Sequence, residues 1–326
     1  MKIICTTPLN HLNDLNKKIS SYGELFYKPN IKSKELKAIL VKKKIDVIFC
    51  NPNRQGYVIN SSILKGSYVR AINTASTGLN HINIDDCKKL GVKVYSLTKD
   101  FSLLKKLPST SELSFGLMIN LLKNINKSHL SVTSYKWNYL PYIGRELSSL
   151  TIGIIGYGRL GKFMAKYCKS FGMKVLIYDP YKNIPISFRK SELNEILNKA
   201  DVISLHVHVK KDTKYMISNK FLNRMKKAPI IINSSRGEIV CEKDIISSLE
   251  LKKISGYGAD VLEDEFGDIK KSPIIKGIKK GLNIIVTPHV GGMTIEGQYR
   301  AWIWAINKFK RISKDIEKLN KFKEAV

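Results

Sequence analysis

The chain has 326 residues and a mass of 37.0 kDa, a length that suits two ordinary domains or one large one. Its hydrophobic fraction of 43% excludes wholesale disorder, and no apolar run is long enough for a membrane helix. Lys plus Arg number 56 against 27 Asp plus Glu, and the resulting net charge of +29 raises the question of a polyanionic partner.

The first hundred residues predict a small α/β unit. Short β-type runs at residues 3–5, 46–50, 68–73 and 92–95 alternate with polar turns, and residues 34–41 have the apolar spacing of a helix. Such alternation predicts a parallel sheet with crossover helices. The chain turns polar at Thr6, too soon for a signal peptide, so its start is interpreted as a first strand.

A long buried helix is predicted over residues 109–122, where apolar residues follow a start signal. Ser109 and Glu112 have the spacing of a capping box, which predicts that Ser109 caps the helix. An aromatic connection with Gly and Pro follows at residues 135–145. Near the end, residues 295–309 hold two Trp residues and predict a helix that packs against the rest of the protein.

The pattern sharpens at residues 151–179, which predict a strand, a glycine-rich turn, a helix and a second strand. The turn carries Gly156, Gly158 and Gly161 with G-x-G-x-x-G spacing, and Asp179 lies 18 positions beyond the last glycine. This order is typical of a dinucleotide site, in which the helix N-terminus faces the pyrophosphate. A carboxylate at Asp179 accepts ribose hydroxyls and repels a 2′-phosphate, so NAD is favoured over NADP.

Three polar segments follow later strand candidates at residues 230–232, 257–261 and 284–286. They supply Arg236, Glu265 and His289. Ligands bind at the carboxyl ends of strands in an open α/β sheet, so the three side chains form a coherent set. Arg236 can clamp a carboxylate, His289 can exchange a proton with a carbonyl oxygen, and Glu265 can raise the pKa of the imidazole.

These segments resemble the D-isomer-specific 2-hydroxyacid dehydrogenase family, which includes phosphoglycerate, glycerate, formate and D-lactate dehydrogenases. The resemblance covers nearly the whole chain and includes residues 76–83, 109–122, 144–147, 204–208 and 221–237. It implies a Rossmann-type doubly wound cofactor domain at residues 108–292. It also implies a smaller flavodoxin-like α/β substrate domain, discontinuous in sequence, at residues 1–107 and 293–326.

The family's functional residues map onto positions of this chain. The resemblance implies NAD as cofactor, a small D-2-hydroxy or 2-oxo acid as substrate, and catalysis by Arg236, Glu265 and His289. It implies that the substrate contacts Thr77, Gly78, Arg236 and His289, and that Asp260 touches the nicotinamide amide. The full set of cofactor contacts it implies is Thr77, Gly156, Gly158, Arg159, Leu160, Gly161, Asp179, His206, Val207, Ser234, Ser235, Arg236, Asp260, His289, Gly291 and Gly292. Tyr57, Arg54 and Thr77 are candidates for substrate specificity. A homodimer through the cofactor domain is expected, with part of residues 130–142, which are rich in aromatics, as a candidate interface.

The chain departs from the family pattern at three places. Phe266 follows the predicted catalytic Glu where the family usually has Pro, which questions the shape of that loop. Leu113 replaces a His common in relatives, and His208 replaces a Pro. Glu263 and Asp264 leave the choice of carboxylate open, and Glu265 is chosen because it stands five residues after Asp260, as in the family.

Two other classes of function stay open. A non-catalytic, NAD(H)-sensing binding protein, as in corepressors of the same fold, is the main alternative. Nucleic-acid binding is less favoured, because Lys accounts for 47 of the basic residues and Arg for only 9, and no basic arm is present. His206 and His208 lack a third ligand, so no metal is expected. Five separated cysteines without a CxxC pair predict reduced thiols and a cytoplasmic protein.

Overall fold

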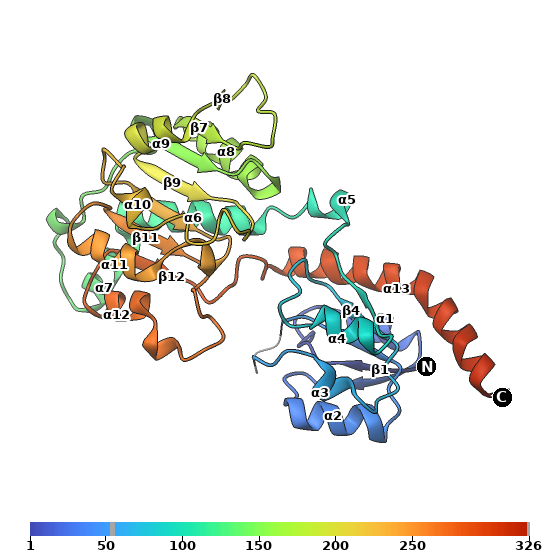
Figure 1. The fold of residues 1–326 in the computed structure, drawn as a ribbon. Coiled ribbons are helices and arrows are strands. Elements are labelled where there is room, and N and C mark those ends of the chain that lie inside the picture. Colours follow the sequence, from blue (N-terminus) through green and yellow to red (C-terminus); the bar gives the residue numbers. More distant parts are fainter. Residues whose placement is uncertain (53–55, 325–326) are drawn as a thin grey trace. The chain divides into compact units, whose positions relative to one another are not determined.

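The chain folds into two compact units. The structure, a computed structural model, describes residues 1–52 and 56–324, with the side chains of the last helix described as far as residue 310 and at 313. Unit 1 consists of Met1–Leu107 and Met293–Val326, and unit 2 is Pro108–Gly292. Each unit is built around its own parallel sheet, which confirms the predicted α/β class (Figure 1).

Unit 1 holds a five-stranded sheet in the order β2-β1-β3-β4-β5, the flavodoxin-like order that the sequence led us to expect. Every strand pair is parallel, with Ile4 opposite Ile48 in the register of the central pair. Its strands are β1 (Lys2–Cys5), β2 (Glu24–Tyr27), β3 (Val47–Cys50), β4 (Ala71–Thr74) and β5 (Lys93–Tyr95). Its helices are α1 (Leu15–Ser20), α2 (Ser33–Lys42), α3 (Ser61–Leu64), α4 (Ile84–Lys89), α5 (Phe101–Leu104) and α13 (Ile295–Glu324).

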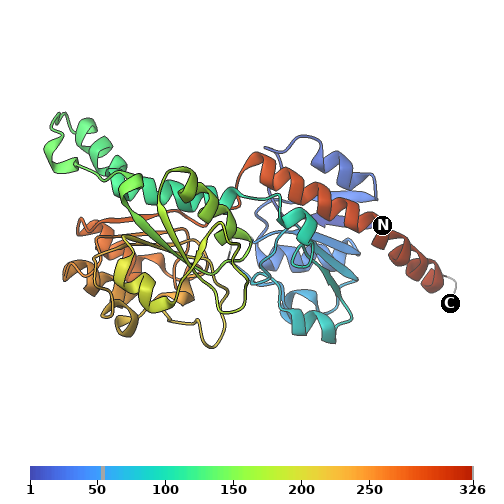
Figure 2. The same cartoon turned by 90° about the horizontal axis from the view of Figure 1, so that it is seen from above.

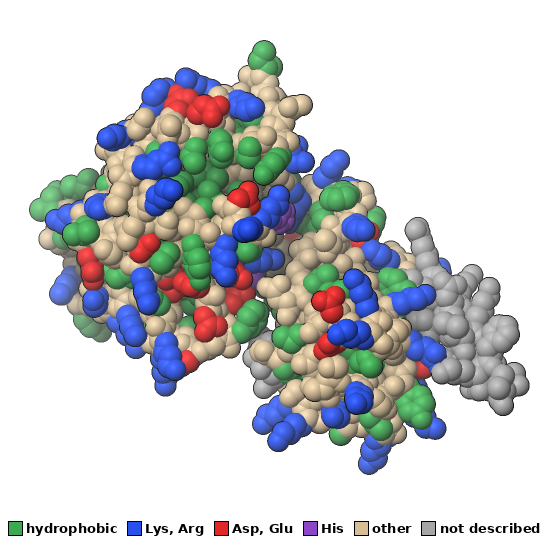
Figure 3. Space-filling view, viewed as in Figure 1, with side chains coloured by type: hydrophobic (Ala, Val, Ile, Leu, Met, Phe, Trp, Pro, Cys, Tyr) green, Lys and Arg blue, Asp and Glu red, His purple; other side chains and the backbone are tan. Residues whose placement is uncertain are grey.

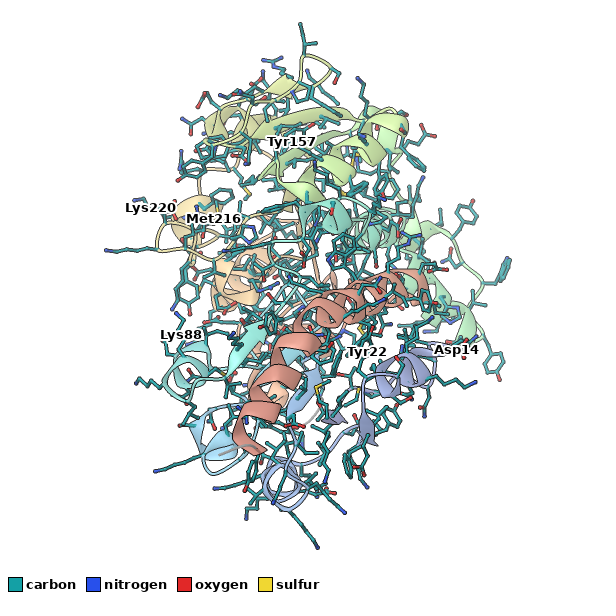
Figure 4. All side chains as sticks on the ribbon, turned by 90° about the vertical axis from the view of Figure 1, so that its right-hand side faces the viewer. Asp14, Tyr22, Lys88, Tyr157, Met216 and Lys220 are labelled. Atoms are coloured by element: carbon teal, nitrogen blue, oxygen red, sulfur yellow. The ribbon has the colours of Figure 1, made fainter. Side chains whose placement is uncertain are left out.

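Helices cover both faces of the unit 1 sheet. On one face α1 and α13 pack over side chains such as Phe49, and on the other α2, α3 and α4 enclose a second core (Figure 1). The ring of Phe309 meets Tyr22 edge-on at 5.6 Å, beside α13 in Figure 4, and Phe49 at 5.0 Å. Complete burial of Phe309 alone contributes about 1.5–3 kcal/mol. The C-terminal helix is therefore part of the core of unit 1.

Unit 2 holds seven parallel strands in the order β12-β11-β10-β9-β6-β7-β8, a Rossmann-type order. The strands are β6 (Thr151–Ile155), β7 (Lys174–Tyr178), β8 (Arg189–Lys190), β9 (Val202–Leu205), β10 (Ile230–Asn233), β11 (Gly256–Ala259) and β12 (Ile284–Val286). The α-helices are α6 (Ser109–Lys123), α7 (Ile125–Thr133), α8 (Arg159–Ser170), α9 (Leu193–Lys199), α10 (Asn219–Leu222), α11 (Glu242–Glu250) and α12 (Pro273–Lys279). Four 3-10 turns complete the unit: η1 (Leu140–Tyr142), η2 (Leu147–Ser149), η3 (Gly237–Ile239) and η4 (Ile269–Lys271).

The start of α6 corrects one expectation. Ser109 is the first helical residue, its neighbour Pro108 is the N-cap, and no capping-box hydrogen bond forms. The Ser109 hydroxyl instead donates to the carbonyl oxygen of Gly291 at 2.5 Å. A tertiary partner thus replaces the local one, because the loop carrying Gly291 lies against the first turn of α6.

The surface of the protein has a projecting segment in unit 2 and scattered basic side chains. In Figure 2, α7 and the segment after it project from one end of unit 2. On the face shown in Figure 3, Lys and Arg side chains are scattered among apolar and acidic ones and form no continuous groove.

None of the helices in the described part of the chain combines the length and apolar character needed to cross a membrane.

Candidate active site

Three catalytic candidates leave the same edge of the unit 2 sheet. Arg236 follows β10, Glu265 follows β11, and His289 follows β12. These strands are neighbours in the order β12-β11-β10, and they are parallel, so their carboxyl ends lie side by side. The fold therefore delivers a guanidinium, a carboxylate and an imidazole to one place.

The imidazole of His289 is hydrogen-bonded to the carboxylate of Glu265. Nδ1 lies 3.0 Å from Oε1 and 2.9 Å from Oε2. The side chain of His289 is 48% exposed and that of Glu265 is 20% exposed. Among the described residues no group hydrogen-bonds to Nε2 of His289, so this nitrogen is available to a ligand while Nδ1 is held. Of the three consecutive acidic residues Glu263, Asp264 and Glu265, it is Glu265 that hydrogen-bonds to the imidazole.

The surroundings of His289 adjust its affinity for a proton. The hydrogen bond to Glu265 raises the pKa of His289 above its ordinary value, and partial burial opposes this effect. The charges of Glu265 and Asp260 raise it further, while the positive charge of Arg236 lowers it. The net result is an imidazole that holds its proton more firmly than a free histidine does, although the nearby charge of Arg236 weakens this effect.

Arg236 projects from a turn that is fixed by hydrogen bonds to its backbone. The side chain of Asn233 accepts from the Ser235 N–H at 3.0 Å and donates to the Arg236 carbonyl at 3.0 Å. The Ser235 hydroxyl donates to Leu205 at the end of β9 at 2.6 Å. No carboxylate of the described residues forms an ion pair with Arg236, whose Nη1 donates to the Ser235 carbonyl at 2.7 Å. The guanidinium therefore keeps donors for an anionic ligand.

Asp260 fixes the turn that carries His289. It is 1% exposed, and its two oxygens accept from the Thr287 hydroxyl at 2.5 Å and from the N–H groups of Val290 at 2.8 Å and Gly291 at 2.7 Å. These contacts hold His289 at a φ of 55°, in the left-handed region that few side chains adopt. Such a backbone persists only where its surroundings enforce it, as at functional sites.

The loop that carries Glu265 is fixed by another buried carboxyl group. Glu242, the first residue of α11, is 3% exposed and accepts from the Glu263 N–H at 2.8 Å and the Ser272 hydroxyl at 2.8 Å. The loop also passes very close to the Arg236 turn, because a Cβ on Gly237 would lie 1.9 Å from the Leu262 carbonyl oxygen. Only glycine permits this approach.

The glycine turn after β6 fits a dinucleotide. Gly156 has a φ of +97°, and a Cβ there would lie 2.4 Å from the His206 carbonyl oxygen. A Cβ on Gly161 would lie 2.1 Å from the Gly156 carbonyl oxygen, whereas one on Gly158 would meet nothing within 4 Å. The turn is thus packed tightly from inside and open at Gly158, where α8 begins. This is the arrangement that lets a pyrophosphate reach a helix N-terminus.

Asp179 and His206 border the same turn. Asp179 is 8% exposed, and its oxygens accept from the N–H groups of Tyr157 at 2.7 Å and Tyr181 at 2.8 Å. Nε2 of His206 lies 2.9 Å from the Ser204 hydroxyl. Burial lowers the pKa of His206 to about 4, so this imidazole is neutral near pH 7. Both residues border the glycine turn, and their contacts to a cofactor stay predictions.

Comparison with known proteins agrees with this geometry. The family model for the D-isomer specific 2-hydroxyacid dehydrogenase, NAD binding domain, matches residues 115–291. The chain belongs to the D-isomer-specific 2-hydroxyacid dehydrogenase family. It is accordingly an NAD-dependent oxidoreductase.

Individual relatives extend the match beyond unit 2. The chain is 32% identical to a hydroxypyruvate reductase of Thermotoga maritima, over 76% of this chain and 79% of that one. It is 30% identical to a D-3-phosphoglycerate dehydrogenase of Methanocaldococcus jannaschii, over 96% of this chain but only 57% of that one. The D-lactate dehydrogenase of Aquifex aeolicus, solved with NAD and lactic acid, is similar with a TM-score of 0.75 and 27% identity, over 98% and 97% of the two chains.

The remaining predicted residues divide between the units. Arg159 and Leu160 begin α8, where the Leu160 carbonyl accepts from Ser111 at 2.9 Å. The Ser234 hydroxyl meets Ser114 of α6 at 2.6 Å. Val207 follows His206 after β9, and Gly292 ends unit 2.

Unit 1 holds the predicted substrate contacts. Thr77 and Gly78 follow β4 in a turn where the Ser76 hydroxyl contacts the Gly78 N–H and carbonyl at 3.1 and 3.0 Å. Their roles, and that of Tyr57, stay predictions, and Arg54 lies outside the described residues.

Sequence reasoning missed the groups that hold the site in place. Glu242 and the hydroxyls of Ser109, Ser111 and Ser114 reach partners that are remote in sequence. A serine-rich face at the start of an apolar helix is the one available signal, because hydroxyls buried there need partners. No comparable signal points from Glu242 to Glu263.

Proposed function

We propose that the protein interconverts a small D-2-hydroxy acid and its 2-oxo acid, with His289 as the general acid and base. The observation that supports this most directly is the pairing of His289 with Glu265 at 2.9 Å, beside an Arg236 that has no carboxylate partner among the described residues. A proton carrier and an anion-binding cation at one sheet edge suit the reduction of a carbonyl next to a carboxylate.

Each side chain has a distinct task in this proposal. Arg236 binds the substrate carboxylate through its planar fork and polarises the neighbouring carbonyl. His289 donates the proton on Nε2 to the carbonyl oxygen during reduction and takes it back during oxidation. Glu265 holds Nδ1, which orients the ring and favours its protonated form. The bound nicotinamide, when present, supplies or accepts the hydride.

Glycine and acidic residues of unit 2 account for cofactor binding and selectivity. Gly158 and the start of α8 receive the pyrophosphate, and Asp179 accepts the adenosine ribose hydroxyls. The Asp179 carboxylate repels a 2′-phosphate, so NADH binds more tightly than NADPH. Asp179→Ser reduces this preference. Equal binding of the two cofactors by the unaltered protein, measured by fluorescence titration, contradicts the role of Asp179.

The substrate is a small anionic 2-oxo acid, and unit 1 is proposed to contribute to its selection. Thr77 and Gly78 are the proposed contacts to its carboxylate. Some relatives carry the names hydroxypyruvate reductase, D-3-phosphoglycerate dehydrogenase and glyoxylate reductase. These names define the panel of substrates that we would test first.

The direct experiment follows NADH absorbance with purified protein and that panel of 2-oxo acids. We expect at least one substrate to be reduced, and His289→Ala to lose this activity. Turnover by His289→Ala at the unaltered rate contradicts the proposed mechanism. Tight NADH binding without turnover of any 2-oxo acid favours instead a non-catalytic NAD(H)-sensing protein of the same fold.

We further propose that the protein is a cytoplasmic homodimer. Its described cysteines are free thiols, which suits a reducing compartment.

An apolar and aromatic surface projects from unit 2, formed by Ile125, Leu130, Val132, Tyr135, Trp137, Tyr139, Leu140 and Ile143. Tyr135 and Trp137 are 99% and 89% exposed, so a partner surface is expected. Light scattering of the unaltered protein and of Trp137→Ser tests this, and a monomeric unaltered protein contradicts it.

A further inference from the structure

Two loops carry the hydrogen-bonded pair at the candidate active site, and they are fixed differently. The His289 turn is held by Asp260, a direct neighbour in the sheet edge. The part of the loop that carries Glu265 runs from Glu263 to Ser272, between the buried Leu262 and α12. Phe266 is 56% exposed, and the Gly267 N–H reaches Asp264 at 3.3 Å within the same turn. The position of Glu265 therefore depends on hydrogen bonds between this loop and residues outside it.

Glu242 forms hydrogen bonds with both ends of this loop. One carboxyl oxygen accepts from the backbone N–H of Glu263, two residues before Glu265, and the other accepts from the hydroxyl of Ser272, just before α12. The Glu242 side chain is fully enclosed at 3% exposure. Because it starts α11, its negative charge also lies at the favourable end of the helix dipole.

We propose that Glu242 is a positioning residue that holds Glu265 against His289, an inference that rests on the proposed function. Glu242 itself touches neither the imidazole nor Glu265. It closes the base of the loop, so that the carboxylate of Glu265 stays within 3.0 Å of Nδ1. A buried hydrogen-bonded carboxyl group suits this task, because breaking its contacts leaves buried polar groups without partners.

The pH dependence of the reaction reports this positioning. Reduction of a 2-oxo acid requires protonated His289, so kcat/KM falls as the pH rises through the pKa of this imidazole. Glu265, Asp260 and Arg236 are the charged groups that act on it. A looser Glu265 supports the charged imidazole less, and the fall in activity then moves to lower pH. Loss of stability alone does not move it.

Two replacements of Glu242 separate position from charge. Glu242→Gln keeps the length of the side chain and can accept from Glu263 and donate to Ser272, but it has no charge. Glu242→Asp keeps the charge and is too short for both contacts. We expect Glu242→Asp to shift the alkaline fall of kcat/KM by at least about half a pH unit to lower pH, and Glu242→Gln to shift it less. Equal shifts, the reverse order or no shift overturn the proposal.

Milder and matched variants complete the experiment. Ser272→Ala removes the hydrogen bond between Glu242 and a partly exposed hydroxyl. We expect it to shift the alkaline fall of kcat/KM in the same direction by less. If Glu242→Asp does not fold, an unshifted Ser272→Ala overturns the proposal. Tyr215→Phe removes a hydrogen bond to the side chain of Glu263 on the same loop and is expected to keep the profile. An equal shift in Tyr215→Phe shows that any lost contact suffices and also overturns it.

Glu265→Gln distinguishes the two levels of inference. It removes the charge that acts on the imidazole directly, so it tests the proposed function and not Glu242. If Glu265→Gln leaves the profile in place, the proposed role of the pair fails. If Glu265→Gln shifts the profile and Glu242→Asp does not, only the positioning role of Glu242 fails.

Discussion

Two histidines follow strands of the same sheet, and their surroundings give them opposite properties. His289 follows β12 and faces a carboxylate, whereas His206 follows β9 and faces the hydroxyl of Ser204. The pKa of His289 is raised by the hydrogen bond to Glu265, and the pKa of His206 is lowered by burial to about 4. Nδ1 of His206 is buried and has no hydrogen-bond partner among the described residues.

The difference shows how the surroundings of a histidine at a sheet edge set its affinity for a proton. Burial alone disfavours the charged form, as at His206, whose backbone and Cβ pack against the glycine turn and whose buried ring has a lowered pKa. A carboxylate on Nδ1 favours the charged form and leaves Nε2 available to a ligand, as at His289. We therefore propose that the His206 turn packs against the cofactor and that the His289 turn carries the proton.

The largest effect is expected from removing the proton carrier. His289→Ala should lower kcat for 2-oxo acid reduction by about 10²–10⁴-fold, because no general acid remains. His206→Gln should lower kcat/KM by less than about tenfold, the value of one neutral hydrogen bond. Steady-state rates with NADH at a fixed pH measure both. Similar losses in the two variants would abolish the distinction between the turns.

Replacing the cation near His289 should change both rate and pH profile. Arg236→Gln should lower kcat/KM by about 10–100-fold, since charge-assisted hydrogen bonds to the substrate are lost. Arg236 lowers the pKa of His289, so its removal raises that pKa and moves the alkaline fall of activity to higher pH. A fall that moves to lower pH would show that Arg236 does not act on the imidazole.

The two turns should also differ in what holds them. Asp260→Asn places an amide N–H against backbone donors and should lower the free energy of unfolding by about 1–3 kcal/mol. Ser204→Ala removes one neutral hydrogen bond beside His206 and should cost about 0.5–1.5 kcal/mol. Urea unfolding curves measure both values. A larger cost for Ser204→Ala would contradict the stronger fixation of the His289 turn.

The smallest effect concerns the net charge of +29. A positive field speeds the capture of small anionic acids, so raising the salt concentration from low to physiological values should lower kcat/KM by about twofold. The same series for His289→Ala should show an equal relative change, because the long-range field comes from the net charge of the whole protein. A kcat/KM that is constant across ionic strength excludes any part of the net charge in function.

Much of the fold and the chemical groups of the site could be predicted from the sequence. The glycine spacing before α8 and the strands ending near Arg236 and His289 are local signals, and each depends on neighbours in the chain. The choice of Glu265 came from its distance to Asp260 in the family pattern. In the structure its carboxylate hydrogen-bonds to His289, and its catalytic role stays a prediction.

What could not be predicted are the contacts between distant segments. Ser109 was expected to cap α6 by accepting from a backbone N–H, but it is the first residue of the helix and its hydroxyl donates to the carbonyl oxygen of Gly291. Glu242 and Asp260 each accept hydrogen bonds from loop residues that lie 21 to 31 positions away in the sequence. Sequence patterns describe which groups a helix or strand presents. They do not describe which loop lies against them once the sheet has formed.

The pairing of His289 with Glu265 is the central claim, and the pH dependence of Glu265→Gln tests it most directly. In the unaltered enzyme the pKa of His289 is raised, so we expect 2-oxo acid reduction to persist to a higher pH than a free imidazole would allow. Without the carboxylate, the alkaline fall of kcat/KM should move to lower pH by about one unit or more. An unchanged profile in Glu265→Gln, measured with NADH and the same substrate, would contradict the account.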